Sequence, residues 1–182
     1  MLVPSPRLSP ARAALAAALF AALPLARAAS APAPALMSPQ WAAAFCAAWN
    51  ATPQLSQGLA GEWLHDDKGR GYKIIELYRD DCGKAGSVEL KIVPRDARAA
   101  CSYGGVPKIE PDFDVDFLMH AKTADWLAMG RGDPGPMWAM MSGRLQFQGP
   151  KLVAMRAIKP FASFLRLVGR VPADAATCPP AR

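Results

Sequence analysis

From Asp116 to Gly149 the chain reads DFLMHAKTADWLAMGRGDPGPMWAMMSGRLQFQG. The order of residue types predicts a strand, a short capped helix, a Gly/Pro loop, a Met-rich helix and a second strand. Met, Trp and Phe are frequent in this stretch, whereas chemically reactive side chains are almost absent. The combination favours a wall around an apolar ligand over a catalytic site.

Two short helices are expected within this stretch. Thr123 is the predicted N-cap of a helix over residues 124–129, which Gly130 ends. The second helix covers residues 137–142, and a strand follows at residues 145–147. Met adapts to ligands of variable shape, although such a set of side chains, taken alone, is more often plain core. The candidate lipid-binding residues are Trp126, Met129, Met137, Trp138, Met141, Phe147, Met155, Phe161, Phe164 and Leu165.

The middle of the chain has the composition of a β-sheet. Residues 72–78 and 87–93 are rich in β-branched and aromatic side chains, and a turn over residues 80–86 joins them. A less regular strand is expected at residues 99–103, and residues 112–117 alternate between acidic and apolar side chains. Alternation at period two predicts a strand with one solvent-exposed face.

Three carboxylates, Asp112, Asp114 and Asp116, would share the solvent face of that last strand. Their spacing resembles the start of a calcium loop. However, Phe117 stands where such a loop needs Gly, and Thr123 stands where it needs Glu. No metal site and no cofactor are therefore expected.

Helices flank the predicted sheet. Ser38 and Pro39 are typical of a helix start, and the apolar spacing predicts a helix over residues 40–51. Residues 151–169 have the spacing of an amphipathic helix, which Pro160 must kink or split. The elements together predict an α+β domain.

The N-terminus has the composition of an export signal. Basic residues at Arg7 and Arg12 precede an apolar run from Ala13 to Leu25, which is shorter than the roughly 20 residues of a spanning helix. We expect a signal peptide over residues 1–28 with cleavage after Ala28, and a periplasmic protein; a retained anchor is the alternative. A disordered Ala/Pro leader (29–39), one domain (40–170) and a C-terminal tail (171–182) would follow.

The charge of the chain argues against nucleic acid. The formal net charge is +6, but it includes three arginines of the expected signal peptide, and no Lys/Arg-rich run is present. The remaining excess of positive charge supports at most a weak attraction to anionic lipid headgroups.

Four cysteines follow the expected cleavage point, and an even number in an oxidising compartment predicts two disulfides. Three connectivities are possible. We favour Cys82–Cys101, which flank a predicted hairpin, and Cys46–Cys178, which would tie the two ends of the domain together. No pair has the CxxC spacing of a zinc or redox site.

A block of small residues and prolines resembles the sterol carrier protein type 2-like family of lipid-binding domains. The resemblance is good over residues 116–158, and Pro150 departs from the Asp or Asn usual in the family at that position. The matching residues are Gly130, Pro136, Ala139, Met141, Ser142, Gly143, Leu145 and Gly149. The resemblance implies a curved, mostly antiparallel five-stranded sheet covered by helices, with an apolar tunnel between the layers and no catalytic residues.

The expected function is therefore non-enzymatic binding and transfer of a hydrophobic lipid, a sterol, an isoprenoid or a fatty acyl compound, in the periplasm. Its expected partners are the lipid and, transiently, a membrane or a lipid-transport protein. One alternative is an accessory scaffold for isoprenoid or quinone lipid metabolism. A second alternative is a lipid esterase that uses His120 with a nearby acid.

Overall fold

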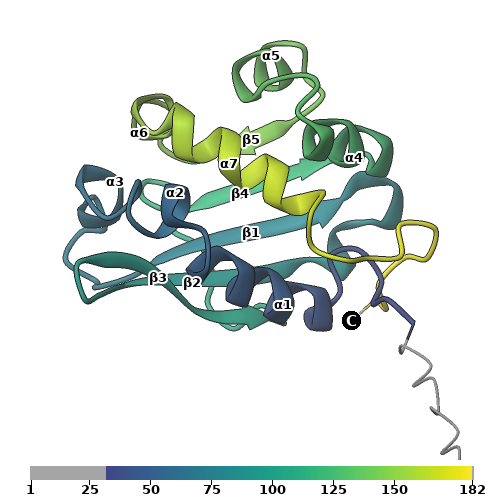
Figure 1. Cartoon of the computed structure of the whole chain (residues 1–182), viewed down its shortest axis with the longest axis horizontal. Helices are drawn as coiled ribbons and strands as arrows, with labels where there is room; N and C mark the ends of the chain where they lie inside the picture. Colours follow the sequence, from purple (N-terminus) through teal and green to yellow (C-terminus); the bar gives the residue numbers. More distant parts are fainter. Residues whose placement is uncertain (1–31, 182) are drawn as a thin grey trace, which may run out of the picture. The chain divides into compact units, whose positions relative to one another are not determined.

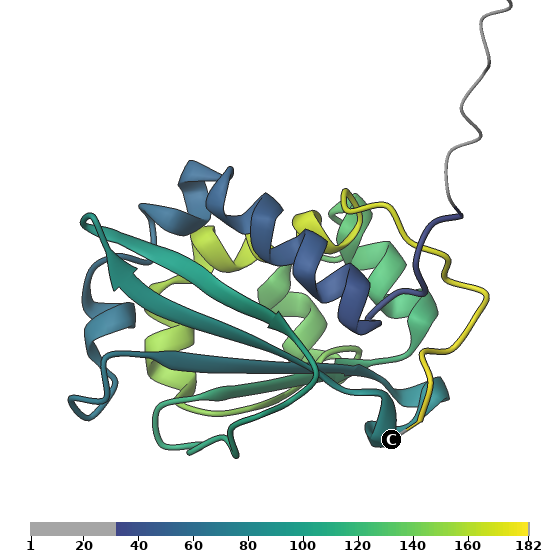
Figure 2. The same ribbon diagram turned by 90° about the horizontal axis from the view of Figure 1, so that it is seen from below.

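A computed structural model describes residues 32–181, so the signal peptide expected over residues 1–28 lies outside the described residues. The domain is a five-stranded sheet with its helices packed on one face (Figures 1 and 2). The strands, in the spatial order β3-β2-β1-β4-β5, are β1 (Lys73–Arg79), β2 (Val88–Arg95), β3 (Arg98–Gly105), β4 (Phe117–Ala121) and β5 (Gln146–Gln148). All neighbours are antiparallel except β1 and β4, which run parallel. The expected α+β class and mostly antiparallel sheet are confirmed.

Seven α-helices and two 3-10 turns complete the described chain. The turns η1 (Asp80–Cys82) and η2 (Lys84–Gly86) join β1 to β2. None of the helices between residues 32 and 181 is long and apolar enough to cross a membrane. The helices are α1 (Pro39–Asn50), α2 (Pro53–Ser56), α3 (Glu62–His65), α4 (Thr123–Arg131), α5 (Pro136–Met141), α6 (Lys151–Arg156) and α7 (Ile158–Val168).

The helix-covered face of the sheet forms the core. Ile75 and Leu77 of β1 pair with Leu90 and Val88 of β2, and all four are buried in one apolar cluster. The residues between them, Ile74, Glu76 and Glu89, point to the opposite face, where they are buried as well. The strand predictions for this hairpin are therefore correct to within two residues.

Helix α1 begins as the sequence indicates. The side chain of Ser38 accepts a hydrogen bond from the backbone of Trp41, and Pro39 occupies the first helical position. Trp41, Phe45 and Trp49 lie on the buried face of the helix. The sheet below and α7 beside it leave these rings fully enclosed.

The expected long final helix is two helices. The break falls at Ala157, between α6 and α7, and Pro160 lies in the first turn of α7. A proline ring removes a backbone donor and clashes with the preceding turn, so it is tolerated only where a helix starts. The chain therefore breaks before Pro160 and not at it.

The strand predicted at residues 112–117 is wrong. Residues 113–115 form a turn and β4 begins only at Phe117. Asp116, expected on a solvent face, is fully buried. It accepts two hydrogen bonds from Arg70, at 2.9 and 2.6 Å, and others from the backbone nitrogens of Ile74 and Asp112. The hydrogen bonds to this buried carboxylate therefore determine the turn, whereas the local alternation of acidic and apolar residues does not determine the structure here.

The boundaries predicted for the next helix also need correction. Lys122, not Thr123, is the N-cap residue of α4, and the backbone nitrogen and hydroxyl of Thr123 instead donate to Asp81. The helix continues through Gly130 to Arg131 and ends at Gly132, which has the left-handed conformation. Gly130 is needed for packing, because a Cβ there would lie 2.7 Å from Gly169, the C-cap residue of α7.

Part of the expected disordered leader is folded. Leu36 and Met37 are buried in the core, and Ala35 bridges to Asp174 of the C-terminal segment. The same segment is held by Arg79, which donates to the carbonyls of Ala175 and Thr177. The folded domain therefore extends beyond the predicted limits of residues 40 and 170.

The predicted disulfide pairing is wrong. The structure pairs Cys46 with Cys101 and Cys82 with Cys178. Helix α1 packs directly on β3, so closely that a Cβ at Gly104 would lie 2.2 Å from the carbonyl oxygen of Ala42. This packing brings Cys46 to β3 and leaves Cys82 to join the C-terminal segment that Arg79 holds.

Lys73 is a fully buried cation at the start of β1. Its Nζ donates to the carbonyl of Val115 at 2.7 Å and lies over the rings of Trp63 and Phe117, 5.4 and 5.3 Å from their centroids. Burial lowers the pKa of Lys73 below its ordinary value of 10.5, although the charge of Asp66 opposes the shift. The ammonium is thus held by one carbonyl and two aromatic faces.

Lys73 should make stability depend on pH. In the interval between its lowered pKa and 10.5, the unfolded chain binds more protons than the folded one, so stability should rise with pH there. We expect the free energy of unfolding of the natural protein to increase relative to that of Lys73→Met as the pH approaches 10.5. Urea denaturation of both proteins in an alkaline series measures the difference, in which other titrating groups cancel. A difference that stays constant or falls would contradict the prediction.

Candidate ligand-binding site

The interior between the sheet and the helices contains a small apolar cavity. Its volume is about 30 Å³, enough for little more than one water molecule. The tunnel that the resemblance implies is therefore not open within the described residues. Large rings fill the space instead. The lining residues are Trp49, Leu59, Trp63, Ile75, Phe117, Met119, Phe147, Ala154, Ala157, Phe161 and Phe164.

A larger hollow opens at the surface between α5, β5 and α6, and we call it the α5–α6 groove. Its volume is about 390 Å³, within the range of small-molecule sites. Gln146 and Lys151 are its polar members, and the remaining lining is apolar. The groove is lined by Met137, Met140, Met141, Leu145, Gln146, Phe147, Lys151 and Met155.

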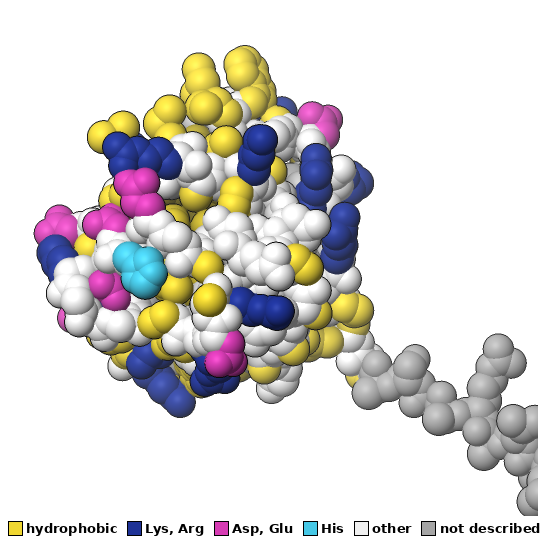
Figure 3. Space-filling view, turned by 60° about the vertical axis from the view of Figure 1, so that its left-hand side comes forward, with side chains coloured by type: hydrophobic (Ala, Val, Ile, Leu, Met, Phe, Trp, Pro, Cys, Tyr) yellow, Lys and Arg dark blue, Asp and Glu magenta, His cyan; other side chains and the backbone are white. Residues whose placement is uncertain are grey.

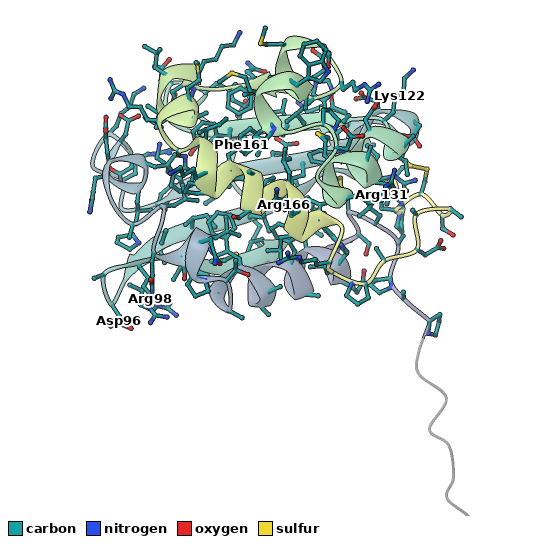
Figure 4. The ribbon with its side chains drawn as sticks, turned by 45° about the horizontal axis from the view of Figure 1, so that its top comes forward. Asp96, Arg98, Lys122, Arg131, Phe161 and Arg166 are labelled. Carbon is teal, nitrogen blue, oxygen red and sulfur yellow. A yellow bond between two sulfur atoms is a disulfide. The ribbon has the colours of Figure 1, made fainter. Side chains whose placement is uncertain are left out.

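Phe147 of β5 lines both the groove and the inner cavity. Its ring lies 5.6 Å from that of Phe117 on β4 and 6.1 Å from that of Phe161 on α7, measured between centroids. Phe161 projects from the first half of α7 (Figure 4). This half-buried side chain thus borders both the groove and the inner cavity.

The sequence-predicted residues divide between these spaces. Phe147, Phe161 and Phe164 line the inner cavity, and Met137, Met141, Phe147 and Met155 line the groove. Met129 and Leu165 lie at a separate recess of about 20 Å³ beside Pro134. Two of the predicted residues line none of these spaces. Trp126 is buried and donates from its indole to the carbonyl of Tyr78, whereas Trp138 is exposed.

Sequence reasoning missed the walls contributed by the N-terminal half. Trp49, Leu59 and Trp63 enclose the inner cavity together with residues more than fifty positions later. Trp63 stacks on Phe117 at 5.6 Å, a contact between α3 and β4. The apolar face of α1 indicated that Trp49 is buried, but nothing in the local sequence indicated which space it borders.

His120 lies on the other face of the sheet, because it alternates with the core residues Met119 and Ala121. Its Nδ1 is 2.6 Å from a carboxylate oxygen of Asp80, and its ring stacks on that of Tyr78 at 4.5 Å. Burial raises the pKa of Tyr78, and the charges of Asp80 and Glu76 add to the shift.

Comparison with known proteins finds a family match for part of the chain. Residues 83–162 match the model of the SCP-2 sterol transfer family, and this segment runs from η2 into α7. No curated protein sequence matches the chain.

Several solved structures are similar to this chain at low sequence identity. A crystal structure of sterol carrier protein 2 is 21% identical with a TM-score of 0.50, covering 75% of this chain and 98% of its own. A possible sterol carrier protein from Thermus thermophilus is 19% identical with a TM-score of 0.49, covering 79% and 94%. A UbiJ-SCP2 ubiquinone synthesis protein is 18% identical with a TM-score of 0.37, covering 68% and 88%. Residues 83–162 are thus similar to the SCP-2 sterol transfer family, and the chain shares its fold with sterol carrier protein 2.

Proposed function

We propose that this protein binds one apolar lipid molecule in the α5–α6 groove and transfers it, without chemical conversion, in the periplasm. The observation that carries the proposal is the position of Phe147, the one residue that lines both the α5–α6 groove and the apolar inner cavity. The family supports it, because its domains bind or transfer lipids and are generally non-enzymatic.

Entry of the lipid would begin at the groove. The flexible side chains of Met137, Met141 and Met155 can follow the outline of different tails. Rotation of Phe147 would then join the groove to the inner cavity, and the tail would extend between the sheet and α7. The aromatic rings that now fill the interior would be displaced or would stack along the tail.

Burial of apolar surface would supply the affinity. A tail that buries about 300 Å² of apolar surface gains roughly 7 kcal/mol before the costs of association. Lys151 and Gln146 stand at the groove and can meet a polar headgroup there. A sterol, an isoprenoid or a fatty acyl lipid would satisfy this division between an apolar interior and a polar mouth.

The proposed location rests on the composition of the N-terminus and on the cysteines. All four cysteines are paired in disulfides, which persist in oxidising compartments such as the periplasm. Cell fractionation and N-terminal sequencing of the protein from its own host would test the location. Residence in the cytoplasm would contradict this part of the proposal.

Native mass spectrometry of the protein purified from its own host would test the carrier function. We expect a discrete adduct of a few hundred daltons that organic extraction removes. A protein that is bare when purified, and stays bare after incubation with sterols, fatty acids and quinones, would overturn the proposal.

Substitution of Met155 by Glu should weaken lipid binding about tenfold or more, because a charge then replaces apolar contact in the groove. Displacement of a fluorescent fatty acid measures the effect. Leu152→Glu is the matched control: Leu152 is exposed on the same helix, α6, and does not line the groove. Equal losses in the two variants would show that the groove is not the binding site.

A further inference from the structure

The large apolar side chains that remain exposed are concentrated in two neighbouring helices. Met137, Trp138 and Met141 belong to α5, and Leu152 and Met155 belong to α6. We call these five residues the α5–α6 patch. Trp138 is 61% exposed and Leu152 is 71% exposed, unusual values for such side chains. Yellow side chains project at the top of Figure 3, which is the end of the molecule where α5 lies in Figure 1.

The chain around this patch carries one sign of charge. Between residues 134 and 173 the sequence has no Asp or Glu, and its six cations are all exposed. In Figure 3, Lys and Arg side chains lie just beneath the projecting apolar ones, and Figure 4 labels Arg166 on α7. The six are Arg144, Lys151, Arg156, Lys159, Arg166 and Arg170.

Carboxylates border the patch only from other segments. Glu62 forms an ion pair with Arg156, and Asp125 lies 3.8 Å from Arg144. No carboxylate of residues 32–181 forms an ion pair with Lys151 or Lys159. The described surface therefore has an apolar apex, and an excess of free positive charge surrounds it.

We propose that the α5–α6 patch docks onto the surface of an anionic phospholipid bilayer, with Trp138 as its anchor. Trp side chains favour the boundary between headgroups and acyl chains, since the ring is apolar and its N–H can hydrogen-bond. Lysines near an anionic surface add attraction that falls off within a Debye length. A second protein is the less fitting occupant, because the cations outnumber the carboxylates that border the apex, and Lys151 and Lys159 form no ion pair with a carboxylate of residues 32–181.

Docking through this patch rests on the proposed function and specifies the side from which the lipid would enter. The α5–α6 groove opens between the two helices that carry the patch. A lipid could therefore pass from the bilayer into the groove without crossing water, since docking would place the mouth of the groove at the headgroup level.

Trp138 gives the experiment a direct signal. The other four Trp side chains, Trp41, Trp49, Trp63 and Trp126, are buried, and Trp49 and Trp63 line the inner cavity, so the part of the quenching that Trp138→Ala removes reports Trp138. We would mix the protein isolated from its host with vesicles of phosphatidylcholine, with and without about one-third phosphatidylglycerol. Expected are flotation with the anionic vesicles only, loss of flotation in high salt, and quenching of Trp fluorescence by phospholipids brominated along the acyl chain.

Two variants separate docking from ligand binding. Trp138 and Lys159 do not line the groove, so Trp138→Ala and Lys159→Glu should retain the lipid adduct in native mass spectrometry. We expect Trp138→Ala to weaken vesicle binding about tenfold and Lys159→Glu about fivefold or more. Any affinity contributed by residues before Pro32 is common to all of the proteins compared.

The result that overturns the inference is vesicle binding that Trp138→Ala leaves unchanged, or that is equal on neutral and anionic vesicles. A dimer in light scattering that Trp138→Ala dissociates would also overturn it, since a second copy would then cover the patch. Absence of a lipid adduct on the natural protein would instead contradict the proposed function. Failure of the docking proposal and failure of the proposed function can therefore be told apart.

Discussion

Replacement of Cys82 and Cys178 by Ala should lower the free energy of unfolding by about 4–5 kcal/mol. The bridge spans 96 residues. Without it, the unfolded chain regains the conformational entropy that closing so long a loop removes, and the unfolded state becomes more favourable. The same change at Cys46 and Cys101, which are 55 residues apart, should cost about 4 kcal/mol. Urea denaturation of the oxidised natural protein and of the two double variants measures both values.

Peptide mapping without reduction provides the control for these variants. It should recover Cys46 linked to Cys101, and Cys82 linked to Cys178. Each double variant should retain the other bridge intact. Recovery of a Cys82–Cys101 peptide from the folded protein would contradict the structure, and a loss below about 1 kcal/mol would contradict the loop-entropy argument.

Substitution of Asp116 by Ala should cost about 3–5 kcal/mol, because it removes one partner of a buried ion pair. The guanidinium of Arg70 would lose both of its carboxylate bonds, and the backbone nitrogens of Ile74 and Asp112 would lose their acceptor. The turn before β4 would then have little to hold it. Thermal or urea unfolding of the variant measures the loss.

Asp114→Ala is the matched control for Asp116→Ala. Asp114 lies in the same turn and pairs with Lys68 at 2.7 Å, but its side chain is 78% exposed. An exposed pair of this kind contributes at most about 1 kcal/mol. Similar effects of the two substitutions would show that the buried carboxylate does not organise the turn.

The fold was largely predictable from local patterns. Strand β2 alternates at period two in sequence from Val88 to Ile92, and Ser38 and Pro39 indicated the start of α1 to within one residue. These features depend on neighbours in sequence, which is why they could be read directly. Gly130 was misjudged because its role is a contact with Gly169, thirty-nine positions later.

The turn before β4 shows where local reasoning failed. The acidic and apolar residues up to Phe117 alternate like a strand, but the partners of Asp116 lie some forty-five positions earlier. The cysteine pairing failed for the same reason, since it follows from the packing of α1 on β3. Composition alone could not supply either contact.

The candidate site was predictable in part. Met137, Met141, Phe147 and Met155 were selected as apolar residues in a Met-rich stretch, and they do line one groove. Trp126 was selected on the same grounds but supports the fold by a hydrogen bond to the carbonyl of Tyr78. Residue type and spacing cannot distinguish the wall of a ligand site from the packed core, because both consist of densely packed apolar side chains.

The sheet ends at β5, which pairs on one side only. An open strand edge beside an apolar groove is a template on which further chains could stack into aggregates. Here the edge is three residues long and is followed by Gly149 and Pro150. Gln146 and Gln148 face outward along it, and Pro150 has no N–H to offer a neighbouring strand. Because β5 is so short, the domain can keep an apolar groove beside this edge, while the edge itself lacks the strand length that fibril growth requires.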